Sequence, residues 1–199
     1  MGGYELSGKI MIDGDAISLL PLELDQLEDL WKAADSKEIW EFTSSRIDSK
    51  DEMMLTIEKA IAERDKGNQI PFAVFDKEKG RIIGSTRFLE ISDIHKTLEI
   101  GWTWYHPEYW RTRVNTETKF LLLKYAFEEM GNNRIQFCTD LRNVRSQKAI
   151  ARIGAKKEGT LRKHRVIADG FVRDTVVFSI IKDEWPAVKA QLQEKLMRT

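Results

Sequence analysis

The sequence predicts a layered α+β fold, with a mixed, mostly antiparallel sheet of about seven strands and helices on both of its faces. Short apolar runs bounded by turn residues alternate with longer stretches whose apolar residues recur at helical spacing. Along the chain these segments give the order βααβββαβαββα. A long helix separates two of the strands, which implies one parallel pair in a sheet whose other strands are mostly joined by turns.

The first half of the chain begins with a strand and two helices and continues with three strands. Leu24, Leu27 and Leu30 recur at helical spacing after the first strand, and Gly67 ends the second helix. The predicted ranges are a strand over residues 16–22, a helix up to residue 34, a helix over residues 51–66 with Met54, Ile57, Ala60 and Ile61 as its apolar stripe, and strands over residues 71–75, 81–91 and 96–104.

The second half contains the long helix between the two parallel strands. Its apolar residues lie on nearly all sides, which is typical of a helix buried on more than one face. Gly131 and Gly154 end helices, and Asp169-Gly170 turns between two antiparallel strands. The predicted ranges are a helix over residues 115–130, a strand over 134–139, a helix over 144–153, strands over 157–168 and 171–181, and a helix over 185–197. Because no repeat or flexible linker interrupts these elements, we expect a single domain over residues 1–199.

Composition excludes several classes of function. The chain has 32 Lys plus Arg and 32 Asp plus Glu, so charge gives no reason to expect nucleic acid or an anionic membrane as partner. No apolar run reaches the roughly 18 residues of a membrane span, and residues 1–5 do not begin a secretory signal. A single cysteine, Cys138, excludes an internal disulfide, and we expect a cytoplasmic location. His95, His106 and His164 lack ligand spacing, so no metal site is expected.

Residues 110–117 follow the strand that feeds the long helix, which is where ligands bind in sheets of this kind. Exposed backbone amides at a helix N-terminus attract phosphate. Arg111 and Arg113 add positive charge, and Asn115 or Thr116 can cap the helix. The segment is therefore either a phosphate site or an ordinary helix cap with two surface arginines.

Three ordered motifs extend this interpretation to most of the chain. Residues 143–159 follow the pattern Asn-x-x-Ser-x-x-Ala-hydrophobic-x-Arg-x-Gly-Ala-x-x-Glu-Gly, residues 110–117 read Trp-Arg-Thr-x-Val-Asn-Thr-Glu, and residues 98–102 read Leu-Glu-Ile-Gly-Trp. In this order they resemble the signature, pyrophosphate loop and fourth strand of the GNAT superfamily of N-acetyltransferases, in its RimJ/RimL-like branch. The wider superfamily has glycines in the pyrophosphate loop, whereas this loop has none.

The resemblance implies a GNAT-like acyl-CoA N-acyltransferase fold and an N-acetyltransferase in which an amine attacks acetyl-CoA directly in a ternary complex. Acetyl-CoA is then a co-substrate, without a metal. The acceptor is either a protein N-terminus or a small amine, and the branch leans towards N-terminal α-amines. The residues implied in binding the cofactor are Trp102, Thr103, Trp104, Arg111, Thr112, Arg113, Val114, Asn115, Thr116, Asn143, Ser146 and Arg152.

Two residues are candidates for proton transfer. An amine is mostly protonated at neutral pH, so a proton must leave before it attacks. Glu99 interrupts an apolar strand beside the loop and can accept that proton, directly or through water; its alternative role is a surface charge or an arginine's partner. A backbone N–H in residues 102–104 is expected to bind the carbonyl oxygen. Ser146 is a candidate proton donor to the leaving thiol, or else a helix cap.

Other features leave alternatives open. Trp40 and Phe42 lie between the first two helices, where they either shape the amine pocket or only fill the core. Cys138 is either an acyl-accepting nucleophile or an inert core residue. The basic residues within 156–165 are either a solvated strand face or an anion-binding surface. The rival to an enzyme is thus a non-catalytic module that binds CoA or nucleic acid on the same fold. The oligomeric state stays open, a homodimer included.

Overall fold

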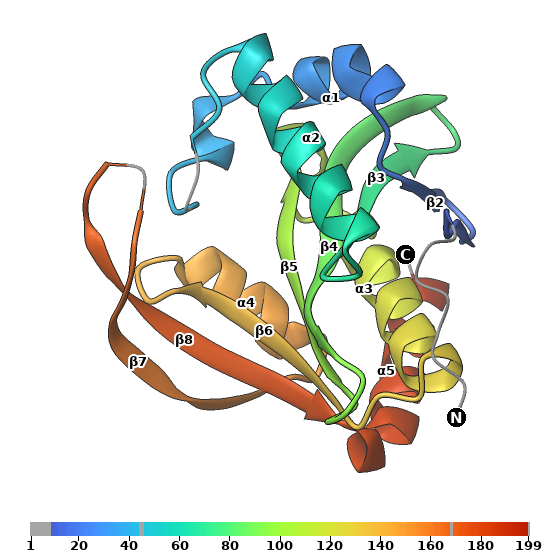
Figure 1. Cartoon of the computed structure of the whole chain (residues 1–199). Coiled ribbons are helices and arrows are strands. Elements are labelled where there is room, and N and C mark those ends of the chain that lie inside the picture. The colour runs from blue at the N-terminus through green and yellow to red at the C-terminus, as the bar shows by residue number, and fades with distance from the viewer. Residues whose placement is uncertain (1–8, 44–45, 168, 199) are drawn as a thin grey trace.

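A computed structural model describes residues 9–43, 46–167 and 169–198. The expectations for residues 1–5, and for Ala168 as the end of a strand, lie outside these residues. Within them, eight strands form one sheet in the order β1-β2-β3-β4-β5-β6-β8-β7 (Figure 1). The strands are β1 (Ile12–Asp13), β2 (Ile17–Pro21), β3 (Ile70–Asp76), β4 (Arg81–Ser92), β5 (Thr97–Tyr105), β6 (Arg134–Asp140), β7 (Lys156–Val166) and β8 (Val172–Ile181).

The pairing confirms the predicted fold class. Every neighbouring pair is antiparallel except β5 and β6, which are parallel and are connected through the long helix. The structure adds β1, in which Ile12 pairs with Leu19 and Asp13 with Ser18. Two residues are too few to produce an alternating pattern, so the sequence did not predict this strand.

The predicted helices are also confirmed, with boundaries shifted by one or two residues. They are α1 (Leu27–Ala33), α2 (Lys50–Asp65), α3 (Val114–Lys124), α4 (Val144–Arg152) and α5 (Trp185–Met197). The Ser49 side chain caps α2 by accepting a hydrogen bond from the Glu52 amide at 3.2 Å. The predicted long helix continues beyond α3 as a π-helical turn over Tyr125–Glu129, which the periodicity did not indicate.

The apolar stripe of α2 differs from the prediction by one residue. Met53, Ile57 and Ala60 are buried, whereas Met54 and Ile61 are only partly buried. Positions 53, 57 and 60 follow the helical period as well as 54, 57 and 61 do. Because two methionines are adjacent, hydrophobicity alone could not decide which of them faces the sheet.

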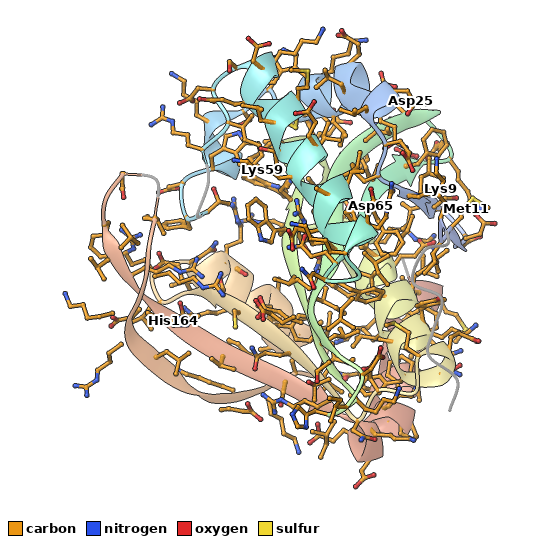
Figure 2. All side chains as sticks on the ribbon, viewed as in Figure 1. Lys9, Met11, Asp25, Lys59, Asp65 and His164 are labelled. Atoms are coloured by element: carbon orange, nitrogen blue, oxygen red, sulfur yellow. The ribbon has the colours of Figure 1, made fainter. Side chains whose placement is uncertain are left out.

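Two apolar cores lie on opposite faces of the sheet. On β3, Phe72 and Val74 belong to the larger core and Ala73 to the smaller one, because successive strand residues point to opposite faces. The larger core contains buried residues of α3, α4 and α5, among them Leu122, Leu123, Ile150 and Leu192. The smaller core contains buried residues of α1 and α2, among them Leu30, Met53 and Ile57. Figure 2 labels Lys59 and Asp65 on α2, both of which are exposed.

β4 and β5 lie close together at Gly84, which pairs with Tyr105. A Cβ atom at this position would lie 2.1 Å from the backbone oxygen of Trp104. Only glycine therefore lets β4 hold the end of β5 in place, close to where the loop before α3 begins.

We expect Gly84→Ala to destabilise the protein by about 2 kcal/mol, because the added methyl group must push two paired strands apart. Gly159→Ala on β7 is the matched control, since a Cβ atom there meets nothing within 4 Å. Urea unfolding of both variants measures the difference. Equal stabilities of the two variants would show that the β4–β5 contact is not tight.

Candidate functional site

The site begins where β5 and β6 separate. The two strands pair only over Thr97–Glu99 and Arg134–Gln136, after which each continues without the other (Figure 1). A cavity of about 620 Å³ fills the fork between them, within the usual size of a ligand pocket. It is lined by residues of β5 and β6, the loop before α3, the first part of α3, the length of α4, the α1–α2 connection and the β7–β8 hairpin.

A β-bulge shapes the β5 side of the fork. Ser85 pairs with Trp104 and Arg87 with Gly101, so β5 has one more residue than β4 over this stretch. Trp102 lies within the bulge and has a left-handed backbone conformation, with a φ of 51°. The Arg87 guanidinium lies 4.4 Å from the centre of the Trp102 ring. A bulge leaves a residue out of the ladder, so backbone groups of residues 102–103 are available to a ligand. Trp102, Thr103 and Trp104, the strand residues that we expect to bind the cofactor, all line the cavity.

The loop before α3 presents free amides. The Thr112 amide donates to the Tyr109 carbonyl at 3.4 Å, and the Val114 amide to the Thr112 hydroxyl at 3.3 Å. No acceptor among the described residues binds the amides of Arg111, Arg113, Asn115 or Thr116. Arg111 has a φ of 66°, so its backbone takes the left-handed conformation, which glycine adopts most easily. The N-terminus of α3 therefore retains the geometry of an anion site.

Not all of the predicted loop side chains face this cavity. Arg111 and Asn115 line it, whereas Thr112, Arg113, Val114 and Thr116 do not. The Arg113 guanidinium is 2.9 Å from Asp15 and 3.4 Å from Glu117, so it is already paired with two carboxylates. The prediction that the Arg113 side chain supplies counter-charge is therefore corrected. Glu117 in turn accepts the Ala16 amide at 2.8 Å, which ties α3 to the edge of β2.

Arginines of α4 complete this end of the cavity. The Arg152 guanidinium donates to the Thr116 hydroxyl at 3.2 Å, which connects the end of α4 to the start of α3. The Arg145 guanidinium lies 3.6 Å from the centre of the Trp110 ring. Arg111, Arg145 and Arg152 all line the cavity, and no ion pair to a carboxylate is recorded for them within the described residues. This end of the cavity is consequently electropositive.

Glu99 lies at the base of the fork, opposite Gln136 in the last parallel pair. It is buried, with 6% of its surface exposed, and its Oε2 accepts a hydrogen bond from Gln136 Nε2 at 3.2 Å. The same nitrogen lies 3.4 Å from Cys138 Sγ. Burial and then the neighbouring Glu99 carboxylate raise the pKa of the Cys138 thiol to about 12. This thiol therefore stays protonated at neutral pH, which disfavours its alternative role as a nucleophile.

Asn143, not Ser146, caps α4. The Asn143 Oδ1 atom accepts the Ser146 amide at 2.9 Å, which leaves the Asn143 amide nitrogen and the Ser146 hydroxyl for other partners. Both residues line the cavity. The alternative role of Ser146 as the helix cap is thus corrected.

The α1–α2 connection covers the opposite end of the cavity. Trp40 is buried in the smaller core, 5.4 Å from Trp104 between ring centres, and it also lines the cavity. Phe42 lines the cavity too and packs against Arg142, whose guanidinium also lies 3.9 Å from the centre of the Phe171 ring. Arg142 therefore joins this connection to the β7–β8 hairpin, which faces it in Figure 1.

Among the charged cavity residues, the sequence analysis missed Lys119 and Arg173, and it left Arg165 in a basic segment whose role stayed open. Lys119 on α3 is buried, and its Nζ donates to the Thr103 hydroxyl at 2.6 Å; burial lowers its pKa from 10.5 to about 7. A lysine one helical turn before the fully buried Leu122 and Leu123 was the available signal. Arg165 and Arg173 belong to the β7–β8 hairpin, and only the strand register shows that both line the cavity.

The described part of the chain contains neither a cluster of metal-binding side chains nor a membrane-spanning helix. There, no group of three or more His, Cys, Asp and Glu side chains has the arrangement to hold a metal ion. No helix over the same residues is long and apolar enough to span a lipid bilayer.

Comparison with known proteins identifies relatives of this architecture. The family profile described as an acetyltransferase (GNAT) domain matches residues 17–156. Two Bacillus subtilis proteins are similar: "Uncharacterized N-acetyltransferase YoaA" is 29% identical over 57% of this chain, and "Putative ribosomal N-acetyltransferase YdaF" is 30% identical over 55%. The matched parts span 63% and 59% of the length of those two proteins. A crystal structure of a putative acetyltransferase from T. thermophilus is 34% identical, with a TM-score of 0.85, and the match covers 94% of this chain and 96% of that one.

We expect the stability effect of Lys119 to depend on pH. Its folded-state pKa of about 7 lies below the unfolded value of about 10.4, so the unfolded state binds more protons between these values. The lysine therefore costs stability increasingly as the pH falls from about 10 to about 7, and the cost is constant below that. Lys119→Met removes this cost, so the variant should be more stable than the wild type, and the difference in free energy of unfolding should grow as the pH falls from about 10 to about 7.

Urea unfolding between pH 6 and pH 10 measures this difference, and Lys124→Met, at an exposed position of the same helix, is the control. A difference for Lys119→Met that does not change with pH would contradict a buried, weakly basic amine.

Proposed function

The chain belongs to the GNAT family of acetyltransferases, and from this premise we propose that it transfers the acetyl group of acetyl-CoA to a primary amine in a ternary complex. The observation that carries the proposal is the fork between β5 and β6, which opens beside the N-terminus of α3. Acetyl-CoA combines a diphosphate with a long arm that carries amides. The fork offers the matching groups: free amides and arginines at one end, and a bulged strand along its side.

The chain's residues fit the donor in three respects. The amides of Arg111, Arg113, Asn115 and Thr116 lack acceptors among the described residues, and a diphosphate at the N-terminus of α3 would provide them. The Asn143 side chain has its oxygen engaged in capping α4, so its nitrogen is left to donate to a carbonyl of the arm. Arg152 would meet the adenosine end, because it is held at the start of α3 by Thr116.

When bound, acetyl-CoA supplies the acetyl thioester, so a carbon–nitrogen bond forms to the acceptor, the carbon–sulfur bond breaks, and one amine proton goes to a base while another goes to the departing sulfur. We assign the base to Glu99, which is buried, lines the cavity and is held in place by Gln136. Backbone N–H groups of the bulge at residues 102–103 would bind the carbonyl oxygen as it gains charge.

The departing sulfur needs little help, because an alkyl thiol titrates near ~8.5. Ser146 is the candidate donor to it, since its hydroxyl is free of the capping role and lines the cavity. Direct transfer to the amine is favoured over an acyl-enzyme, since the Cys138 thiol, with a pKa of about 12, is a poor nucleophile. The acceptor would then approach between Trp40, Phe42 and the β7–β8 hairpin.

Replacing the base should abolish most of the activity without affecting donor binding. We expect Glu99→Gln to reduce turnover at neutral pH by about 100-fold, because the amine then loses its positioned proton acceptor. Thiol release from acetyl-CoA, with peptides and small amines as acceptors, measures turnover, and calorimetry measures donor binding. Glu90→Gln, at an exposed position of β4, is the control and should behave as wild type. Unchanged turnover in Glu99→Gln would remove Glu99 from the mechanism.

The phosphate site can be tested with a pair of donors. Arg111→Asn keeps a residue that tolerates the left-handed conformation but removes the guanidinium. We expect the KM for acetyl-CoA to rise about tenfold, because a charged hydrogen bond to phosphate is lost. S-acetylpantetheine, which lacks the phosphates, should be used equally well by the variant and the wild type. An equal effect on both donors would place Arg111 away from the phosphates.

A further inference from the structure

Arg165 and Arg173 lie directly opposite each other on β7 and β8. Like charges at opposing positions of a ladder destabilise a sheet. Both side chains line the same cavity as Glu99. Figure 2 labels His164 on β7, the residue that precedes Arg165 in the chain. Two facing guanidinium groups at a cavity wall are an arrangement that folding alone does not favour.

Neither arginine has a carboxylate partner within the described ranges. Arg173 is buried, with 7% of its surface exposed, and its side chain donates one hydrogen bond to the described residues, from Nε to the Thr175 hydroxyl at 3.2 Å. The nearby Asp140 is already engaged, because Arg142 donates to its two oxygens at 3.1 and 2.7 Å. Arg165 is exposed, whereas Arg173 is a buried charge without an ion-pair partner in the described part of the chain. Such a charge is costly, so we expect an anion that the chain itself does not supply to bind here.

Arg165, Arg173 and Glu99 line one cavity, and the charges of Arg165 and Glu99 both influence the pKa of Arg173. Burial and then the charge of Arg165 lower the pKa of Arg173, while the charges of Asp140 and Glu99 act in the opposite direction. The charge of Glu99 raises the pKa of the Cys138 thiol, whereas the charge of Arg165 lowers it. The two guanidinium groups and the Glu99 carboxylate therefore face one shared space.

We propose that Arg165 and Arg173 bind a carboxylate carried by the acceptor, so that the substrate is an amine with a carboxylate near it. The proposal rests on the acetyl transfer proposed above. In this arrangement the ammonium group faces Glu99 and the carboxylate faces the guanidinium pair, whose planar donors fit a carboxylate in pairs. An amino acid with a free carboxylate and a peptide beginning with an acidic residue share this chemistry.

The arginine pair is distinct from the phosphate site. Arg165 and Arg173 belong to the β7–β8 hairpin, whereas the free amides lie at the start of α3 and their accompanying arginines on α4 and in the loop before α3. The hairpin also contacts the α1–α2 connection through Arg142, Phe42 and Phe171, on the acceptor side. A donor that occupies the fork would thus leave the pair to the second substrate.

Matched acceptors test the proposal. One pair is alanine and alaninamide, and the other is a tripeptide amide beginning with Asp and its counterpart beginning with Asn. Thiol release at saturating acetyl-CoA should give a kcat/KM at least about tenfold higher for the carboxylate member of at least one pair. Which pair shows the preference separates a free amino acid from an acidic peptide. Equal kcat/KM values in both pairs would overturn the proposal.

Variants then assign the preference to these residues. In Arg165→Gln and Arg173→Gln, the ratio of kcat/KM for the carboxylate acceptor to kcat/KM for its neutral counterpart should fall towards one. The main cause should be a higher KM for the carboxylate acceptor. Arg162→Gln, on β7 but not lining the cavity, should retain it. Because Arg165→Gln relieves a like-charge contact, its melting temperature should not fall, so that a loss of preference cannot be attributed to unfolding. A preference that survives in both variants would overturn the assignment.

Failure of the proposal is distinguishable from failure of the acetyl transfer. If neutral amines are turned over in a Glu99-dependent way and carboxylate acceptors are not preferred, the proposed acetyl transfer is supported and the proposed carboxylate site is refuted. If no acceptor is turned over, calorimetry with N-acetylalanine and N-acetylalaninamide decides. Binding of the carboxylate compound by the wild type, but not by Arg165→Gln, would support the pair; equal binding by both proteins would refute it.

Discussion

The short parallel pairing of β5 with β6 determines where chemistry can occur in this molecule. Three residues of each strand hydrogen-bond, and the strands then separate. The bulge at Trp102 shifts the register of β5 against β4 and leaves residues 102–103 out of the ladder, beside the fork. The fork places Glu99 at its base and the N-terminus of α3 at its side, so one irregularity of the sheet brings the proposed base and the anion site to one cavity.

Several charged groups converge on this cavity, and three of them, Lys119, Glu99 and Arg173, are buried at a cost in stability. Lys119 lies under the bulge, Glu99 lies at the base, and Arg165 faces Arg173 across the hairpin. Packing does not require any of them, since apolar residues would fill the same volume at lower cost. Unfavourable charges that converge on one cavity are more typical of a functional site than of a structural network.

The sequence predicted what depends on local chemistry and missed what depends on register. Helix ends, turns and the single parallel pair followed from glycines, caps and hydrophobic spacing, and β5, the loop before α3 and α4 were placed correctly around one cavity. The partnership of Arg113 with Asp15 joins positions 98 residues apart, and no local pattern indicates it. The sequence left Arg165 in a basic segment that was either a solvated strand face or an anion-binding surface, and it did not single out Arg173, because only the pairing of β7 with β8 brings the two together at the cavity.

The division between donor and acceptor sides also explains why family membership does not identify the substrate. The family match ends at Lys156, where β7 begins, so the hairpin that carries Arg165 and Arg173 lies outside it. The groups proposed to bind the donor lie inside the match, in β5, the loop before α3, and α4. A shared donor accounts for similarity in the matched part, whereas the hairpin is free to differ with the acceptor. The charges of the hairpin are therefore the most direct structural information on what this acetyltransferase accepts.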